Sequence, residues 1–239
     1  MFVSRRGNTG PALLCLHGAG GNHRHWGRLL ADLAPQMRGF ALDLPGHGRS
    51  APLGRTTIAE YAHATLAALD SLELEQAILC GHSMGGAIAL MLALHAPHRV
   101  AGLILIGSAA RLRVAPPIIA GFEHDPRAAV DQLVELIFAA NAPAELRAAA
   151  RAEYLQCPPA IFRDDFRACD GFDLREHLAQ IQAPALVIAG DADRLVPRKL
   201  SDEVVAGIAG ARQVILAHVG HTPMLEAPDA VAAAITDGF

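Results

Sequence analysis

Ser83 stands at the centre of the segment GHSMG, residues 81–85. An apolar run at 77–80 precedes this segment directly, and an apolar helical pattern from 84 to about 95 follows it. Ser83 therefore falls where a strand turns sharply into a helix, and the flanking glycines permit a tight turn and a close approach of the helix to the sheet. Such a turn exposes the hydroxyl, so the pattern predicts a nucleophilic serine.

A serine hydroxyl needs a general base, and the base needs a carboxylate that holds its tautomer. His221 and the pair Asp191 and Asp193 each come shortly after an apolar, strand-like run. Because the carboxyl ends of parallel strands meet at one edge of a sheet, we expect these side chains near Ser83. Their position along the chain leaves both aspartates open as the acid.

The elements that would position these residues follow an alternating pattern. Short apolar runs bounded by glycine or proline alternate with longer helical patterns, which predicts an α/β fold whose mostly parallel sheet has helices on both faces. Strands are expected at 12–16, 39–42, 77–80, 103–106, 185–189 and 213–216. The segment TIAE at 57–60 is a capping box that opens one connecting helix. A hydrophobic content of 52% is enough for one large core.

The alternation stops between 111 and 183, where several short helical patterns follow one another. Asp125 and Pro126 are typical of a helix N-cap and first turn. We therefore expect a core made of 1–110 and 184–239, and a helical lid at 111–183 over the edge that carries Ser83. Candidates for its apolar inner wall are Phe122, Leu133, Ile137, Phe138, Phe162 and Phe166.

Five motifs in consistent order resemble the α/β-hydrolase superfamily, in its lidded serine esterase and lactonase branch. They are LHG at 16–18, DLPGHGRS at 43–50, GHSMGG at 81–86, GDAD at 190–193 and GH at 220–221. In that family the acid stands three residues after the glycine, which implies a triad of Ser83, Asp193 and His221. Met84, the residue after the nucleophile, would supply one N–H of an oxyanion hole, and the resemblance adds the N–H of Ala19.

The resemblance implies hydrolysis of a carboxylic ester, with water as the second substrate. Lactonase, thioesterase, perhydrolase and enol-lyase activities use the same triad and stay open, as does a receptor that binds a ligand without turnover. A serine at this place argues against dehalogenase and epoxide-hydrolase chemistry, which need an aspartate nucleophile. Thr222 follows the histidine where related dione hydrolases usually carry tryptophan, which disfavours C–C bond hydrolysis.

The family usually begins with two antiparallel strands, whereas about a dozen residues precede the strand that leads to the first motif here. We therefore expect one short strand around 2–5 and a sheet of about seven strands. An exposed edge strand can pair with another subunit, so a monomer and a homodimer both stay open.

Other polar residues near the motifs have structural interpretations. His17 and His47 are expected to hydrogen-bond the loops around the site, and His82 to point away from the nucleophile. No metal-binding spacing surrounds His25. Trp26 could equally line a pocket or pack in the core.

Composition argues against several partners. The formal net charge is −4 and the basic residues are scattered, so we expect no nucleic acid. The sequence has no run close to the roughly 20 apolar residues of a membrane span and no leader pattern, so no membrane and a cytoplasmic location are expected. His23 stands where a dinucleotide loop needs its third glycine, and the four cysteines match no zinc pattern. Neither a cofactor nor a metal is expected.

Overall fold

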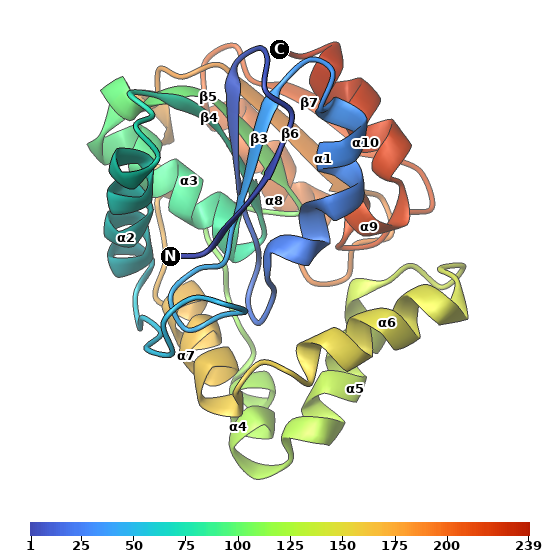
Figure 1. The fold of residues 1–239 in the computed structure, drawn as a ribbon. Helices are drawn as coiled ribbons and strands as arrows, with labels where there is room; N and C mark the ends of the chain where they lie inside the picture. Colours follow the sequence, from blue (N-terminus) through green and yellow to red (C-terminus); the bar gives the residue numbers. More distant parts are fainter.

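Seven strands form one sheet through the middle of the molecule (Figure 1). The computed structural model describes all 239 residues, Met1–Phe239. The strands are β1 (Val3–Arg6), β2 (Ala12–Leu16), β3 (Arg38–Leu42), β4 (Ala77–His82), β5 (Val100–Ile106), β6 (Ala185–Gly190) and β7 (Arg212–Leu216). Their order is β1-β3-β2-β4-β5-β6-β7, and only β1 runs antiparallel to its neighbour. The predicted sheet, including the single short strand at its edge, is confirmed.

Helices cover both faces of this sheet, because its inner strands are apolar on both sides. One face carries α2 (Ile58–Ser71), α3 (Met84–His95) and α8 (Arg198–Gly207), and the other carries α1 (Gly27–Leu33), α9 (Pro223–Glu226) and α10 (Pro228–Thr236). Each face of the sheet has its own hydrophobic core: the first lies under α2, α3 and α8, and the second under α1, α9 and α10. Within β2, the side chains of Leu14 and Leu16 pack in the first core, and those of Leu13 and Cys15 pack in the second. Trp26 is fully buried in the second core, so its role is packing.

Four α-helices lie between β5 and β6, followed by a 3-10 helix (Arg175–Gln180), and the α-helices gather below the sheet in Figure 1. They are α4 (Pro116–His124), α5 (Pro126–Ile137), α6 (Ala144–Tyr154) and α7 (Pro159–Asp170). We call this segment the helical insertion. Its helices pack around an apolar cluster of their own, in which the rings of Phe122 and Phe162 stack with centroids 4.4 Å apart.

The two ends of the helical insertion meet. Arg111 and Asp173 form an isolated antiparallel bridge, and the N–H of Leu174 donates to the carbonyl of Ala110 at 2.8 Å. The chain therefore leaves the sheet and returns to it at one place.

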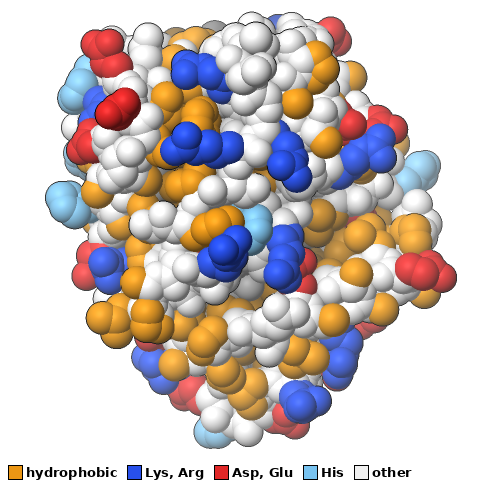
Figure 2. All heavy atoms as spheres, viewed as in Figure 1, with side chains coloured by type: hydrophobic (Ala, Val, Ile, Leu, Met, Phe, Trp, Pro, Cys, Tyr) orange, Lys and Arg blue, Asp and Glu red, His pale blue; other side chains and the backbone are white.

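Hydrophobic, basic and acidic side chains are interspersed on the face of the molecule in Figure 2. No helix of the structure combines the length and apolar character that a membrane span requires.

Candidate active site

Ser83 occupies the sharp turn between β4 and α3. Its φ of 51° lies in the left-handed region that non-glycine residues rarely adopt, and such strain is common at catalytic positions. A Cβ on Gly81 would overlap the carbonyl of Gly85, and a Cβ on Gly85 would overlap the carbonyl of Leu16. The glycines around Ser83 are therefore required by close backbone contacts.

We expect Gly85→Ala to lower the free energy of unfolding by about 3 kcal/mol or more, because the new methyl group meets rigid backbone of β2 rather than a movable side chain. Urea denaturation followed by circular dichroism measures this change. Gly27→Ala is the matched control, since a Cβ there has no neighbour within 4 Å and the residue is helical. An equal loss in both variants would contradict the steric explanation.

His221 lies in the loop after β7 and is joined to Asp193 in the loop after β6. The distance from His221 Nδ1 to Asp193 Oδ2 is 2.8 Å, and both residues are buried. The other oxygen of Asp193 accepts the N–H groups of Leu195 and Val196, at 2.9 and 2.8 Å. Since Nδ1 donates to the carboxylate, Nε2 is left as the basic nitrogen.

Asp191 has a different environment, although it stands only two residues earlier. Its carboxylate accepts the N–H of His218 at 2.6 Å and so closes a turn. The structure thus pairs His221 with Asp193 and leaves Asp191 in the role of a turn residue.

Ser83 and His221 line the same cavity, which has a volume of about 240 Å³. Its apolar lining consists of Ala19, Leu112, Val114, Ile118, Leu133, Phe166, Cys169, Leu195, Val196 and Leu200. The Ser83 hydroxyl has no hydrogen-bond partner in the structure, and catalytic hydrogen bonds often tighten only when substrate binds. The sequence-predicted nucleophile and base therefore face one apolar pocket.

Two backbone N–H groups border the nucleophile. The N–H of Ala19, on the wall of the same cavity, donates to no protein acceptor. Met84 opens α3, where helix geometry leaves N–H groups without intrahelical partners and the helix dipole favours negative charge. A Cβ on Gly18 would lie 3.1 Å from the Cβ of Ser83, so Gly18 allows the loop to approach the serine.

A family model described as "Alpha/beta hydrolase family" matches residues 13–234, which is most of the chain. The chain belongs to the alpha/beta hydrolase family. Among curated proteins, it is 33% identical to the pimeloyl-[acyl-carrier protein] methyl ester esterase of Serratia marcescens, over 91% of this chain and 89% of that protein. It is 30% identical to the protein of the same name from Pectobacterium carotovorum, over 94% and 91%.

Solved structures of the family agree with the fold. The enol-lactonase from Burkholderia xenovorans LB400 superimposes with a TM-score of 0.91 at 27% identity, and the match covers 99% of this chain and 95% of that one. The resemblance predicted from five motifs is confirmed.

Two further histidines of this α/β hydrolase support the loops of the site. His17 Nε2 accepts the N–H of Leu44 at 3.0 Å, as expected for a loop-bonding residue. His82 was expected to have a structural role and to point away from the nucleophile, and its Nε2 donates to the carbonyl of His221 at 2.9 Å. Burial, with the neighbouring His221, holds the pKa of His82 well below its ordinary value. His82 is therefore a neutral donor that holds the backbone of His221.

Glu226 also supports the loop of His221, and the sequence reasoning did not single it out. One of its oxygens accepts the N–H groups of Gly220 and Ala139, at 3.0 and 2.9 Å. The other accepts the N–H and the hydroxyl of Thr222, at 3.2 and 3.0 Å. The segment TPMLE at 222–226, with a proline opening a short helix, is the local signal that could have indicated it.

The predicted apolar wall divides into two groups. Leu133 and Phe166 line the cavity, whereas the remaining four candidates are buried in the core of the helical insertion. Those four are Phe122, Ile137, Phe138 and Phe162.

Arginines that were not predicted for the site also line its cavity: Arg111, Arg113 and Arg175. The Arg175 guanidinium lies 2.7 Å from Asp173 and lowers the pKa of that carboxyl to about 2. Asp173 also pairs with Arg111, Arg113 pairs with Asp170, and Glu203 lines the same cavity, so this wall is polar and its charges largely balance.

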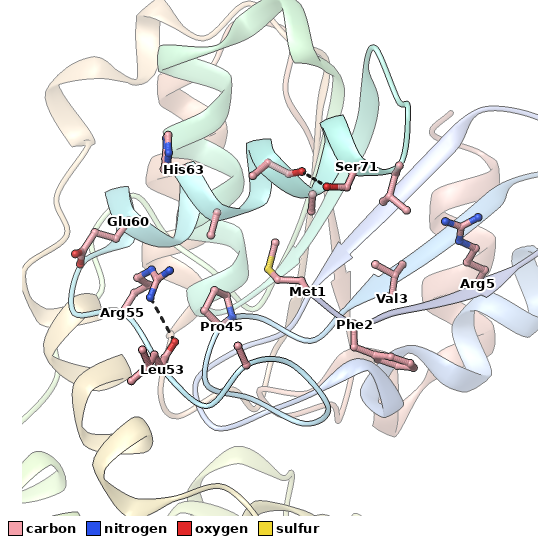
Figure 3. Close-up of a pocket in the computed structure, with 15 residues that line it drawn as sticks. Met1, Phe2, Val3, Arg5, Pro45, Leu53, Arg55, Glu60, His63 and Ser71 are labelled. Carbon is pink, nitrogen blue, oxygen red and sulfur yellow. Dashed lines mark hydrogen bonds between the residues drawn. The ribbon is translucent and has the colours of Figure 1, made fainter.

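A larger cavity, about 690 Å³, lies elsewhere, between β1 and α2 (Figure 3). It contains Glu60, His63 and Ser71, but Glu60 is engaged with the cap of α2 and Ser71 donates to a carbonyl of the same helix. Cavity size alone therefore does not mark the site. The structure has no group of three or more His, Cys, Asp or Glu side chains that could hold a metal ion.

Proposed function

We propose that this chain hydrolyses carboxylic esters through an acyl intermediate on Ser83. The observation that carries the proposal is the 2.8 Å bond between Asp193 and His221 at the wall of the cavity that Ser83 also lines. Family membership and the esterases among its relatives support the reaction class.

The reaction would proceed in two halves. His221 Nε2 takes the proton of the Ser83 hydroxyl as its oxygen attacks the ester carbonyl, and the proton then passes to the departing alcohol. A water molecule then attacks the acyl-serine with the same proton transfers through His221, which releases the carboxylic acid and restores the Ser83 hydroxyl. Asp193 stabilises the imidazolium that forms in each half, and the N–H groups of Ala19 and Met84 would stabilise the two tetrahedral oxyanions.

The helical insertion would act as the lid of this site. It contributes Ile118, Leu133 and Phe166 to the cavity from three different helices. We accordingly assign the catalytic core to 1–110 and 184–239 and the lid to 111–183.

A lactone is an ester closed on itself, so lactonase activity is the second candidate. It is favoured by the structural likeness to an enol-lactonase. Thioesters would follow the same steps. A receptor without turnover is the alternative of another class, and the unpartnered N–H of Ala19 beside the serine argues against it.

Turnover of 4-nitrophenyl acetate combined with covalent labelling tests the proposal. A fluorophosphonate should modify one serine per chain, mass spectrometry should locate the label on the peptide that contains Ser83, and turnover should fall in proportion to labelling. Turnover that persists after complete labelling, or a label on another serine, would overturn the proposal.

Acyl-chain preference gives a prediction of its own. A cavity of about 240 Å³ is smaller than most pockets for drug-sized ligands, so short and medium chains should fit best. We expect kcat/KM to fall by about tenfold or more between the 4-nitrophenyl hexanoate and dodecanoate esters. A steady rise up to dodecanoate would show that the long chain lies outside this cavity.

A further inference from the structure

A fully buried carboxylate of the helical insertion lies beside the loop of Ala19. Asp165, in α7, accepts the N–H of Gly20 at 2.9 Å. The same side chain accepts the hydroxyl of Tyr61 at 2.6 Å and bonds His47 Nε2 at 2.8 Å. One carboxylate thus joins the helical insertion to three separate segments of the core, and Gly20 directly follows the proposed oxyanion donor.

A second residue of α7, Phe162, packs against the same glycine. Gly20 has a φ of +66°, and a Cβ on it would overlap the ring of Phe162. Phe162 and Asp165 are three residues apart, so they share one face of the helix. The ring covers Gly20 while the carboxylate holds its N–H.

His47 supplies a positive charge that offsets the cost of burying the Asp165 carboxylate. Its Nδ1 lies 3.1 Å from the carbonyl of Pro45 and its Nε2 lies against Asp165, so both ring nitrogens face acceptors. A histidine with two acceptors is a doubly protonated cation. Burial alone lowers the pKa of His47, but the Asp165 carboxylate outweighs it and holds that pKa well above its ordinary value. Asp165 and His47 therefore form a buried ion pair.

The peptide that carries the N–H of Ala19 is also held through its carbonyl. The carbonyl of Gly18 accepts the N–H of Gly21 at 3.1 Å and bonds His17 Nδ1 at 2.8 Å, whereas the N–H of Ala19 itself is free. An oxyanion donor must be placed to within a few tenths of an ångström to be effective. The bond from Gly20 to Asp165 fixes the next peptide, on the other side of the Ala19 Cα, so the two peptides that flank Ala19 are held from the core and from α7, respectively.

We propose that Asp165 is a positioning residue for the oxyanion hole: by holding the N–H of Gly20, it completes from α7 the set of bonds that aims the N–H of Ala19 at the tetrahedral intermediate. This inference rests on the proposed function. It adds that the helical insertion completes the catalytic geometry besides shaping the cavity.

The test compares Asp165→Asn with the wild type on 4-nitrophenyl butyrate. We expect kcat to fall by about 10- to 100-fold and KM to change by less than about threefold. An asparagine brings one acceptor oxygen where the carboxylate serves Gly20, His47 and Tyr61, and it cannot balance the charge of His47, so its hold on the N–H of Gly20 is weakened. The inhibition constant of an alkylboronic acid, whose tetrahedral serine adduct places an oxygen in the hole, should rise by a factor similar to the fall in kcat. A merely structural role would lower the thermal midpoint and leave both quantities of the folded enzyme unchanged.

Asp164→Asn is the matched control, since this neighbouring carboxylate pairs with Arg163 and makes no contact with the loop of Ala19. Its kcat should stay within about twofold of the wild type. Tyr61→Phe provides a milder change that keeps the ring and removes the hydroxyl, which donates to Asp165 and accepts the N–H of the part-buried Arg55; its kcat should fall by about three- to tenfold.

Each outcome decides the inference. A folded Asp165→Asn variant with wild-type kcat would overturn it, as would a loss that appears only in KM. If Asp165→Asn does not fold, an unchanged kcat in Tyr61→Phe would overturn it instead. The proposed function fails separately, through wild-type protein without turnover or turnover that survives the loss of the Ser83 hydroxyl.

Discussion

Ser83→Ala is expected to lower kcat for 4-nitrophenyl ester hydrolysis by about 10⁴-fold or more, because the proposed mechanism forms the acyl intermediate on this hydroxyl. The fold should survive, since the hydroxyl has no hydrogen-bond partner to lose. The unusual φ of Ser83 is carried by the backbone, and alanine adopts it with similar strain. Any remaining rate would come from binding and from the oxyanion hole.

The measurement is initial-rate kinetics on purified variants whose circular dichroism spectra match. Ser71→Ala is the control, because Ser71 is an exposed serine at the end of α2 whose hydroxyl only bonds a helix carbonyl. Its kcat should equal that of the wild type. Substantial turnover by Ser83→Ala would mean that another nucleophile performs the chemistry.

Asp193→Asn is expected to lower kcat by about 10³- to 10⁴-fold. An amide at this position can present its NH₂ to His221, which favours the wrong tautomer and removes the charge that stabilises the imidazolium. The loss should appear in kcat rather than in KM, because Asp193 is buried behind the histidine and does not line the cavity.

Asp191→Asn separates this effect from the general removal of a carboxylate in the same loop. An asparagine oxygen can still accept the N–H of His218, so kcat should change by less than about threefold. Equal losses in the two variants would show that the acid is misassigned.

Much of this molecule could be predicted because its signals are local. The capping box placed the start of α2, where Thr57 accepts the N–H of Glu60, and the apolar runs located the strands. Periodicity could not separate Leu133 from Phe162, because both are apolar positions of helices that have a cavity on one side and a core on the other.

Contacts between side chains that are far apart in the chain could not be predicted from the sequence. In the sequence, Asp165 cannot be distinguished from an exposed charge on a surface helix. Only the fold brings its carboxylate to Gly20, His47 and Tyr61. The choice of Asp193 over Asp191 likewise needed the family pattern, since both follow the same strand. Local chemistry was thus readable, whereas the pairing of distant side chains was not.

The bridge between Arg111 and Asp173 makes the helical insertion an exchangeable module. Since its ends already meet, segments of different length and sequence could be spliced in without moving β5 or β6. Pocket shape and triad geometry can then diversify independently during evolution or in the laboratory. A grafted segment would still have to bring a carboxylate to Gly20, so chimaeras should be selected for that acceptor first.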